Sequence, residues 1–481
     1  MKNVFNGPIP AELGEYDIPG VWDDSRRVTP GSLFAALSGP AAKGEDFIPA
    51  AVEKGARVVM VAANSLLTWA MRYPNVFFVG VPDPRAAFEE VAREFYGHPA
   101  SKVRIIGVTG TNGKTTITYL LESILKAAGR SSGVIGTVNY RVQGHVIPSK
   151  NTTPGFLDNQ IFLKELVDRG VPYAVIEASS HALHQARVSG ADFRGGIFTN
   201  LTGDHLDYHR TMDAYFAAKA ALFTKLDPHA WAVVNVDDAY GRTLPSLTQA
   251  RVLTYAVHAA ADVRGVIEAI GLKGTTFTIE FFESKIRIET SFIGLHNVYN
   301  ILAAFAAALA DGIPPETIRQ GIECLPCVPG RLERVEAGQD FFIFIDYAHT
   351  DDGLKNVLEG LQAVRHKKLI VVFGCGGDRD RTKRPRMGKV ACDLADHAII
   401  TSDNPRSEDP QSIIDEVIPG FTKKSYECVV DRQAAIERAL TIAEIGDIVL
   451  LAGKGHETYQ VLKDRTIDFV ERDIVERFVR K

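Results

Sequence analysis

The stretch Gly110-Thr111-Asn112-Gly113-Lys114-Thr115-Thr116 stands between an apolar run, residues 103–108, and a segment of helical character, residues 117–128. We expect a buried strand before it and a helix after it. A glycine-rich turn that enters a helix exposes backbone N–H groups without internal partners, and such groups bind phosphate. Lys114 adds a positive charge for phosphate, and the Thr115 hydroxyl can join the coordination sphere of Mg²⁺. The stretch therefore predicts a nucleotide polyphosphate site.

The spacing of this stretch departs from the strict Walker A pattern. That pattern would place a glycine at position 108, where this chain has Val108, and the additional glycines are Gly107 and Gly110. A glycine turn without a ligand would explain the glycines alone. It would not explain Lys-Thr-Thr directly after a strand.

Length and composition indicate a globular enzyme. With 481 residues the chain is too long for one ordinary core, so two to four domains are expected. The net charge of −5 gives no general attraction to nucleic acid or to an anionic membrane. The first residues lack the apolar stretch of a signal peptide, and no run reaches transmembrane length, so we expect a cytoplasmic protein.

The cysteines do not indicate a disulfide framework, because there are five of them, an odd number. Cys324 and Cys327 have the spacing of a metal or redox pair, yet no second Cys or His pair lies at zinc-finger distance. We expect two structural thiols at these positions.

Composition divides the chain into three blocks, residues 1–98, 99–329 and 330–481. In the second block strands alternate with helices, as in a parallel sheet covered on both faces, so the predicted fold class is α/β. Its strand candidates include residues 174–177 and 232–235, and the alanine-rich residues 300–310 predict a buried helix.

The third block repeats a pattern of an apolar strand followed by a polar loop. Strands at 369–373, 398–401 and 448–452 precede, in turn, the loops Gly374-Cys-Gly-Gly377, Asp403-Asn404-Pro405-Arg406 and Gly453-Lys-Gly455. In open α/β sheets ligands bind beyond the carboxyl ends of the strands. The three loops therefore predict one shared site.

Candidate catalytic residues lie in the second block. Glu177 ends an apolar strand and could serve Mg²⁺ or be a helix N-terminal acid. The loop at 200–209 contains two acids and two imidazoles, including His205, which favours metal or phosphate chemistry. Lys219 lies in an otherwise apolar helix, where composition favours a lysine that snorkels to solvent.

Two further pairs have alternative interpretations. Asn297 and Asn300 share one helix face and could cap the helix or contact a base. Arg331 stands at a block boundary. It could form a surface ion pair, or it could contact phosphate, which would require domain closure. Asp346 follows directly after the strand at 341–345.

The loops of the third block contain Arg379 and Arg406 together with the carboxylate of Glu457. Arginine binds a carboxylate through two parallel hydrogen bonds, and a carboxylate can hold an amino group. These residues predict a pocket for an amino acid bearing more than one charge. A surface ion-pair network is the alternative.

Taken in order, these motifs resemble the Mur ligase family of ATP-dependent amide-forming enzymes. The resemblance rests on the phosphate-binding stretch, Asp204-His205-Leu-Asp207-Tyr208-His209, His296-Asn297-Val-Tyr-Asn300 and Pro329-Gly330-Arg331, and it covers essentially the whole chain. Within the family, Asp24-Ser25-Arg26, Asn151-Thr152-Thr153, Asp346-Tyr-Ala-His349 and Asp403-Asn-Pro-Arg406 point to the member that adds 2,6-diaminopimelate.

The resemblance implies a small mixed α/β uridine-binding domain (1–98), a central P-loop ATPase domain (99–329) and a C-terminal Rossmann-like domain (330–481). It also implies a monomeric cytoplasmic enzyme of peptidoglycan precursor synthesis that acts on small molecules, with ATP and Mg²⁺. ATP would phosphorylate the D-Glu γ-carboxylate of UDP-N-acetylmuramoyl-L-Ala-D-Glu, and the amine of meso-diaminopimelate would displace phosphate.

The same resemblance implies roles for individual positions. For ATP they are Gly110, Thr111, Asn112, Gly113, Lys114, Thr115, Thr116, Asn297, Asn300, Arg331 and Asp346. For Mg²⁺ they are Thr115, Glu177, His205 and Lys219, the last as a carbamate, which reverses the interpretation from composition. For the UDP-sugar dipeptide they are Ser25, Asn151, Thr152, Thr153, Ser179, Gln185 and Arg187. For diaminopimelate they are Arg379, Asp403, Asn404, Pro405, Arg406, Gly453 and Glu457.

Arg406 suits the second carboxylate of diaminopimelate, and lysine would leave it without a partner. The chain departs from the family at Pro40-Ala41-Ala42, where relatives often have a histidine, and at Asp351, where proline is usual. The alternatives are the same reaction with L-lysine, glutamate addition to folate, or a P-loop nucleotide switch, and the N-terminal block argues against the folate enzyme.

Overall fold

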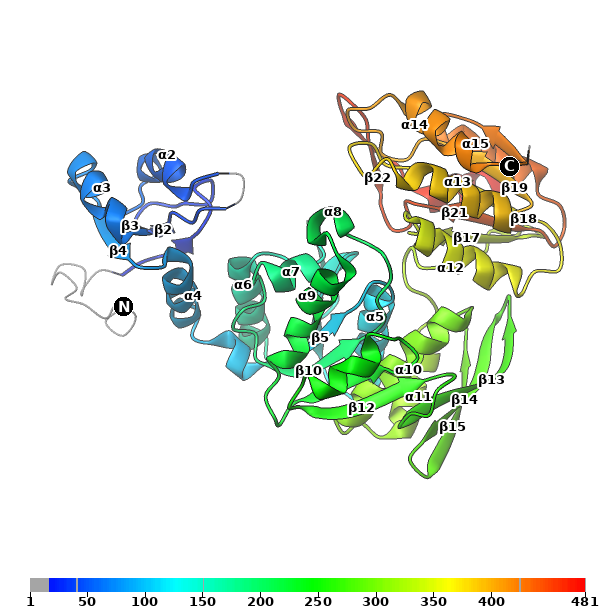
Figure 1. The fold of residues 1–481 in the computed structure, drawn as a ribbon, viewed down its shortest axis with the longest axis horizontal. Coiled ribbons are helices and arrows are strands. Elements are labelled where there is room, and N and C mark those ends of the chain that lie inside the picture. The colour runs from blue at the N-terminus through cyan, green and yellow to red at the C-terminus, as the bar shows by residue number, and fades with distance from the viewer. Residues whose placement is uncertain (1–16, 40–41, 150, 424, 481) are drawn as a thin grey trace. The chain divides into compact units, whose positions relative to one another are not determined.

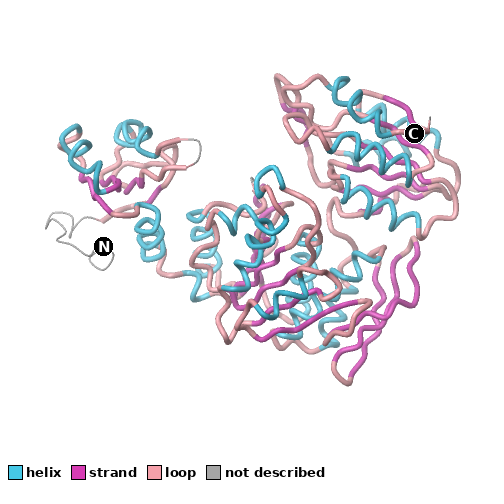
Figure 2. The backbone as a smooth tube through the Cα atoms, viewed as in Figure 1, coloured by secondary structure: helices cyan, strands magenta, loops and turns pink. Residues whose placement is uncertain are grey.

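The computed structural model describes residues 17–39, 42–149, 151–423 and 425–480. Within these ranges the chain is a mixed α/β protein with four sheets (Figures 1 and 2). Pro40 and Ala41, two residues of the first family departure, lie outside the described residues. None of the helices in these ranges is both long enough and apolar enough to cross a membrane.

The described chain separates into two compact units. Unit 1 contains the described residues up to Ile105 together with Pro154–Ala174 and Gln185–Asp192, and unit 2 contains Ile106–Thr153, Val175–His184 and the described residues from Phe193 onward. The predicted domain boundaries after residues 98 and 329 stay predictions.

Unit 1 contains a parallel sheet of order β1-β2-β3-β4. Asp83 begins α4, because its carboxylate accepts from the N–H groups of Arg85 and Ala86 that the helix leaves unpaired. Phe88 and Val91 of α4 then pack against the apolar side of this sheet. The strands are β1 (Val21–Trp22), β2 (Leu33–Ala35), β3 (Val58–Ala62) and β4 (Phe77–Val81), and the helices are α2 (Ile48–Glu53), α3 (Leu66–Arg72), α4 (Pro84–Phe95) and α6 (Phe156–Asp168).

The largest sheet has eleven strands in the order β15-β14-β13-β12-β11-β10-β5-β9-β6-β7-β8. Its strands are β5 (Arg104–Thr109), β6 (Ser132–Ile135), β7 (Asn139–Val142), β8 (His145–Pro148), β9 (Tyr173–Glu177), β10 (Phe193–Phe198), β11 (Trp231–Asn235), β12 (Arg251–Ala256), β13 (Val263–Gly271), β14 (Gly274–Phe281) and β15 (Ser284–Thr290). The helices of this region are α5 (Lys114–Ala127), α7 (Ser180–His184), α8 (Leu206–His209), α9 (Met212–Thr224), α10 (Leu295–Ala310) and α11 (Pro315–Glu323).

Strands β10 to β13 are parallel neighbours, which confirms the predicted parallel sheet there. The two ends of the sheet are antiparallel meanders, β13-β14-β15 and β6-β7-β8, which the sequence analysis did not predict. The signal for the first meander is an alternation in β14, where Thr275, Phe277, Ile279 and Phe281 are buried and the residues between them are not.

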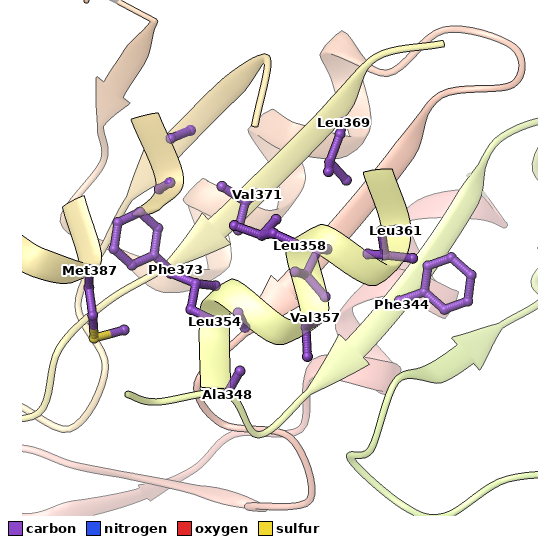
Figure 3. Packing of buried hydrophobic residues seen from close by; sticks show 14 of the residues in the cluster. Phe344, Ala348, Leu354, Val357, Leu358, Leu361, Leu369, Val371, Phe373 and Met387 are labelled. Carbon is purple, nitrogen blue, oxygen red and sulfur yellow. The ribbon is translucent and has the colours of Figure 1, made fainter. Parts of the chain in front are cut away.

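The six-stranded sheet has the order β16-β17-β21-β18-β19-β20, with β17 to β20 parallel. Helices α12, α13 and α14 cover one face, with the core in Figure 3, and α15 and α16 cover the other. The strands are β16 (Glu333–Val335), β17 (Phe342–Asp346), β18 (Leu369–Phe373), β19 (His397–Ile400), β20 (Tyr426–Cys428) and β21 (Ile448–Ala452), beside a separate hairpin of β22 (Tyr459–Val461) and β23 (Thr466–Asp468). The helices are α12 (Asp351–Gln362), α13 (Lys383–Leu394), α14 (Pro410–Val417), α15 (Arg432–Ile442) and α16 (Glu471–Val479).

The predicted strands at 369–373 and 448–452 are confirmed residue for residue. Two predicted helices begin earlier than expected: α5 begins at Lys114, and α10 begins at Leu295. In both cases the glycine before the helix, Gly113 or Gly294, has a positive φ that ends the preceding turn, so polar residues form the first helical turn.

Candidate active site

The phosphate-binding loop joins β5 to α5 and requires its glycines. Gly110 and Gly113 have φ of +146° and +90°, which L-residues with side chains rarely adopt. A Cβ at Gly110 would collide with Thr199 Oγ1, and one at Gly113 would collide with Asn300 Oδ1. The loop is therefore closed in on two sides, and it leads into the N-terminus of a 14-residue helix, which favours anions.

The loop after β10 supports the phosphate loop. Asn200 accepts from the N–H of Thr111 through its carbonyl, at 2.8 Å, and from the N–H of Asn112 through Oδ1, at 2.9 Å. Thr199 Oγ1 donates to the Asn112 carbonyl at 2.6 Å. These bonds fix the backbone of the loop before any ligand is bound.

Two lysines donate to one carbonyl oxygen of this loop. Lys114 Nζ lies 2.9 Å from Gly110 O, and Lys219 Nζ lies 2.6 Å from the same atom. The Lys219 side chain is buried, at 1% exposure, so the snorkelling interpretation from composition is wrong. Burial, followed by the charge of Lys114, holds the pKa of Lys219 well below its usual value, and burial also lowers the pKa of Lys114.

Glu177, at the end of β9, is fully buried, and its carboxylate accepts from Thr137 on the loop after β6. Thr137 donates to it through both its backbone N–H and its hydroxyl, each at 2.9 Å. A Cβ at Gly136 would collide with Glu177 Oε1, so the loop passes close to the carboxylate. The Glu177 charge also acts on Lys114, which places the carboxylate beside the phosphate loop.

His205 precedes α8 with φ of +55°, and its ring stacks edge-on against His181 at 4.8 Å between centroids. Burial is the main cause that lowers the pKa of His205; Asp204 opposes this, and Lys114 and Lys219 add to it. The ring therefore lies within electrostatic reach of both active-site lysines.

Two of the four predicted magnesium ligands, Thr115 and Glu177, offer the oxygen atoms that a hard cation prefers. Thr115 is buried with its hydroxyl at the loop, and Glu177 offers carboxylate oxygens. Across the described ranges no three or more His, Cys, Asp and Glu side chains are grouped to hold a metal by themselves. Mg²⁺ usually retains water and takes substrate phosphate oxygens, so one or two protein carboxylates suffice.

Asn297 and Asn300 brace the phosphate loop. Asn297 Nδ2 donates to Ile293 O at 2.9 Å, and Asn300 Nδ2 donates to Asn297 Oδ1 at 3.1 Å. Both side chains are buried at the start of α10. Asn300 packs against Gly113, and Asn297 accepts from Asn300, which explains why these polar residues occur in a helix that is otherwise apolar.

Arg331 reaches the phosphate loop from the start of the third block. Its Nη2 donates to Thr115 Oγ1 at 3.1 Å, and its guanidinium lies 5.0 Å from the ring centre of Tyr347. Asp346 accepts from the N–H groups of Leu332 and Ala348, and its burial raises the pKa of its carboxyl. Asp346 therefore fixes the backbone next to Arg331.

Four predicted residues of the amino-acid pocket meet where β19 and β21 end. Asn404 Nδ2 donates to Glu457 Oε2 at 2.9 Å. Asp403 is buried, and its Oδ2 has no hydrogen-bond partner within the described part of the chain. A Cβ at Gly453, whose φ is +117°, would lie 2.7 Å from that oxygen. A buried carboxylate oxygen left open in this way can bind a ligand amino group.

Lys454, which the sequence analysis missed, joins this group. It is fully buried and donates to Asn404 Oδ1 at 3.1 Å and to Glu457 Oε2 at 3.0 Å. Only its place in the Gly453-Lys-Gly455 loop after a buried strand could have indicated it.

Arg406 is held in position by backbone atoms. Its Nη1 donates to Gly377 O at 2.7 Å, and the residue has φ of +52°. A Cβ at Gly376 would lie 2.9 Å from Arg406 Nη1 and 3.7 Å from Arg379 Cγ, so the two arginines are close together. The parallel strand ends thus gather the predicted residues into one site, as expected.

A second missed residue, Arg384 of α13, supports this pocket. Its fully buried guanidinium donates to Glu408 at 2.8 and 2.9 Å and to Glu416 at 2.8 Å. Glu408 in turn accepts from the N–H of Asp378 at 2.6 Å. Arg384 therefore links the loop that contains Arg379 to the loop that contains Arg406.

The predicted residues for the UDP-sugar dipeptide fall in both units. In unit 2, Thr153 Oγ1 donates to Glu177 O at 2.5 Å and accepts from the N–H of Ser179 at 3.1 Å, while Asn151 is exposed. Thr152 Oγ1 lies 3.1 Å from Thr137 Oγ1. In unit 1, Arg187 donates to Gln185 Oε1 at 2.6 and 2.9 Å, and Ser25 is buried.

Asp351, the second departure, begins α12, and Arg386 Nε donates to its carboxylate at 2.8 Å. Both residue types are favourable in the first turn of a helix. An acid interacts with the positive end of the helix dipole, and proline has a helical φ already and no N–H to leave unpaired. Cys324 and Cys327 are free thiols, and burial raises the pKa of Cys327.

The sequence of this chain matches models of one protein family over most of its length. Three family models match: Mur ligase family, catalytic domain, at residues 17–96; Mur ligase middle domain at 108–308; and Mur ligase, glutamate ligase domain, at 330–455. The UDP-N-acetylmuramoyl-L-alanyl-D-glutamate–2,6-diaminopimelate ligase of Solibacter usitatus is 44% identical over 98% of this chain and 96% of its own. That of Bacillus licheniformis is 42% identical over 100% of this chain and 97% of its own.

Solved structures of Mur ligases have the same fold as this chain. A UDP-N-acetylmuramoyl-L-alanyl-D-glutamate–2,6-diaminopimelate ligase superposes with a TM-score of 0.70 at 33% identity, over 100% of this chain and 98% of that chain. The MurF ligase of Thermotoga maritima in complex with ADP has a TM-score of 0.64 at 19% identity, over 95% of both chains, and shares the fold.

Proposed function

The chain belongs to the Mur ligase family, and from this membership we propose that it joins 2,6-diaminopimelate to UDP-N-acetylmuramoyl-L-alanyl-D-glutamate, with ATP converted to ADP and phosphate. The observation that supports an amino-acid substrate is the open Oδ2 of Asp403, a buried acceptor for an amino group. The next residue, Asn404, donates to Glu457, and Arg406, whose Nη1 lies 3.4 Å from Asn404 O, suits the second carboxylate of diaminopimelate.

The residues of the phosphate loop would bind and orient ATP. Backbone N–H groups at the start of α5 face the phosphates, and Lys114 places its charge beside them. The D-Glu γ-carboxylate attacks the γ-phosphorus, ADP leaves, and an acyl phosphate forms. Arg331, at the phosphate loop already, is positioned to stabilise the negative charge on the transferred group.

The amine of diaminopimelate, held by Asp403 and Glu457, then attacks the acyl carbon. The amine loses a proton, a tetrahedral intermediate forms, and its collapse expels phosphate. Thr115, Glu177, His205 and a carbamylated Lys219 would hold Mg²⁺, which supplies positive charge for the phosphate oxygens.

We assign residues 1–98 to uridine binding, 99–329 to ATP and 330–481 to the amino acid, following the resemblance. Ser25, Thr152, Thr153, Ser179, Gln185 and Arg187, with Asn151, are assigned to the UDP-sugar dipeptide on the same ground. We place the protein, as a monomer, in the cytoplasm, where ATP and nucleotide-linked sugars are available.

The test is phosphate release by purified protein with Mg-ATP and UDP-N-acetylmuramoyl-L-Ala-D-Glu. Separate reactions receive meso-diaminopimelate, L-lysine or no amino acid, and product masses are measured. Turnover to the tripeptide product with diaminopimelate alone is expected. Turnover with lysine would refute the specificity, and phosphate release indifferent to every small substrate would instead indicate a nucleotide switch.

A further inference from the structure

Asp352 binds two catalytic loops at once. It lies in the first turn of α12, and its Oδ2 accepts from Asn112 Nδ2 at 2.9 Å and from Thr202 Oγ1 at 2.9 Å. Asn112 belongs to the phosphate loop, and Thr202 belongs to the loop after β10. One carboxylate oxygen therefore joins three segments that lie far apart in the sequence.

Both donors are anchored independently of Asp352. The N–H of Asn112 donates to Asn200 Oδ1 at 2.9 Å, and the N–H of Thr202 donates to Thr111 Oγ1 at 3.1 Å. Asp352 thus receives hydrogen bonds from a preformed surface of the ATP-binding region. Hydrogen bonds to an ionised acceptor are roughly twice as strong as neutral ones, so the two hydrogen bonds that the Asp352 carboxylate accepts can hold these segments together.

A second contact joins the same regions, but it serves a different purpose. Arg331 donates to Thr115 Oγ1, the hydroxyl that is proposed to bind Mg²⁺. A metal ion held by that hydroxyl would compete with Arg331 for the same oxygen. The hydrogen bonds of Asp352 use side-chain atoms that no proposed step requires, so they can persist throughout.

We propose that Asp352 is a positioning residue of the ligase reaction: its carboxylate holds the six-stranded sheet and its amino-acid pocket against the phosphate loop, so that the attacking amine meets the acyl phosphate. The inference rests on the proposed function. It predicts that Asp352 affects the ligation step far more than it affects nucleotide binding.

The experiment compares Asp352→Ala and Asp352→Asn with a matched control, Asp351→Asn. The control removes the same charge from the same helical turn, but Asp351 pairs with Arg386 instead of the loops. For Asp352→Ala, kcat/KM for diaminopimelate falls about 100-fold, since small misplacements of reacting groups have effects of this size. The Kd of an ATP analogue changes less than about threefold, because the phosphate-binding N–H groups remain.

Asp352→Asn retains an acceptor oxygen with two lone pairs and therefore recovers most of the activity. Thr202→Val combined with Asp352→Ala costs no more than Asp352→Ala alone, because Asp352→Ala already removes the contact to Thr202 Oγ1. Three outcomes would each overturn the proposal. They are additive losses in the double variant, an Asp352→Asn variant as impaired as Asp352→Ala, and equal losses of analogue binding and of ligation in Asp352→Ala. Wild-type protein that makes no tripeptide would instead refute the proposed function, which keeps the two failures distinct.

Discussion

The Nζ of Lys219 donates a hydrogen bond of 2.6 Å to the carbonyl oxygen of Gly110, inside the phosphate loop. Lys114 donates to the same oxygen, so two lysine side chains converge on one carbonyl, and that of Lys219 is buried. Both the burial and the mutual repulsion favour the neutral amine of Lys219.

A neutral Lys219 amine can attack carbon dioxide, release a proton and become a carbamate. We expect protein incubated with ¹³C-bicarbonate to show a carbamate carbon signal by NMR that Lys219→Arg lacks. The arginine variant cannot form a carbamate and offers no oxygen ligand, so kcat falls about 100-fold or more, the size of loss seen when one electrostatic contributor is removed. A labelled signal that persists in Lys219→Arg would assign the carbamate elsewhere.

The same lysine is expected to lower stability. The unfolded chain keeps the Lys219 proton up to a pKa near 10.5, whereas the folded chain releases it at lower pH. Between these values the unfolded state binds more protons, so the unfolding free energy falls as pH is lowered through that window. In buffer free of carbon dioxide, Lys219→Met is therefore more stable than wild type, by a margin that grows as pH falls from about 10.5.

The control for this measurement is Lys126→Met, at an exposed position near the end of α5. Its stability difference from wild type should stay nearly constant over the same pH range. Parallel pH profiles for wild type and Lys219→Met in chemical denaturation would contradict the buried neutral lysine.

Gly110→Ala is expected to abolish turnover with little nucleotide binding left, because the new Cβ collides with Thr199 Oγ1 at a φ of +146°. The matched control is Gly129→Ala, at φ of +69°, where nothing lies within 4 Å. That variant carries only the backbone strain, about 1–2 kcal/mol, and should keep its ATP affinity. Isothermal titration with an ATP analogue separates the two, and equal binding by both would show that the loop adapts.

Arg406→Lys is expected to reduce kcat/KM for diaminopimelate by about 100-fold, since it loses a bidentate pair worth about 2–3 kcal/mol. Turnover with L-lysine should change much less, so discrimination falls. Arg438→Ala, at an exposed pair with Glu427, serves as the control and should behave as wild type. A proportional loss with both amino acids would mean that Arg406 supports the loop rather than reading the substrate.

Strand positions were predictable from the sequence where a continuous apolar run is followed by a polar loop. The strands at 369–373 and 448–452 show this, because a parallel strand buried on both faces must be apolar throughout. Helix starts were harder to predict: α10 begins at Leu295, directly after Gly294 with its positive φ. Asn300, further along this helix, packs against Gly113 of the phosphate loop, a tertiary contact that no local pattern contains.

Residues that act through other residues were the least predictable. Arg384 and Lys454 belong to no sequence motif. Arg384 acts through Glu408, which lies 24 residues away in sequence, and Lys454 acts through Glu457, which lies 3 residues away. Lys219 shows the opposite case: composition favoured an exposed, charged amine, whereas the structure buries the amine, lowers its pKa and lets it donate to Gly110 O.

The position of Arg406 has an evolutionary consequence. Its guanidinium donates to the carbonyl of Gly377, and Arg384 with Glu408 joins the same two loops without using the side chain at position 406. A lineage could exchange that residue, and with it the preferred amino acid, without rebuilding the scaffold. The architecture thus separates the capacity to form the bond from the choice of what is joined, and selection can alter the second while the first stays intact.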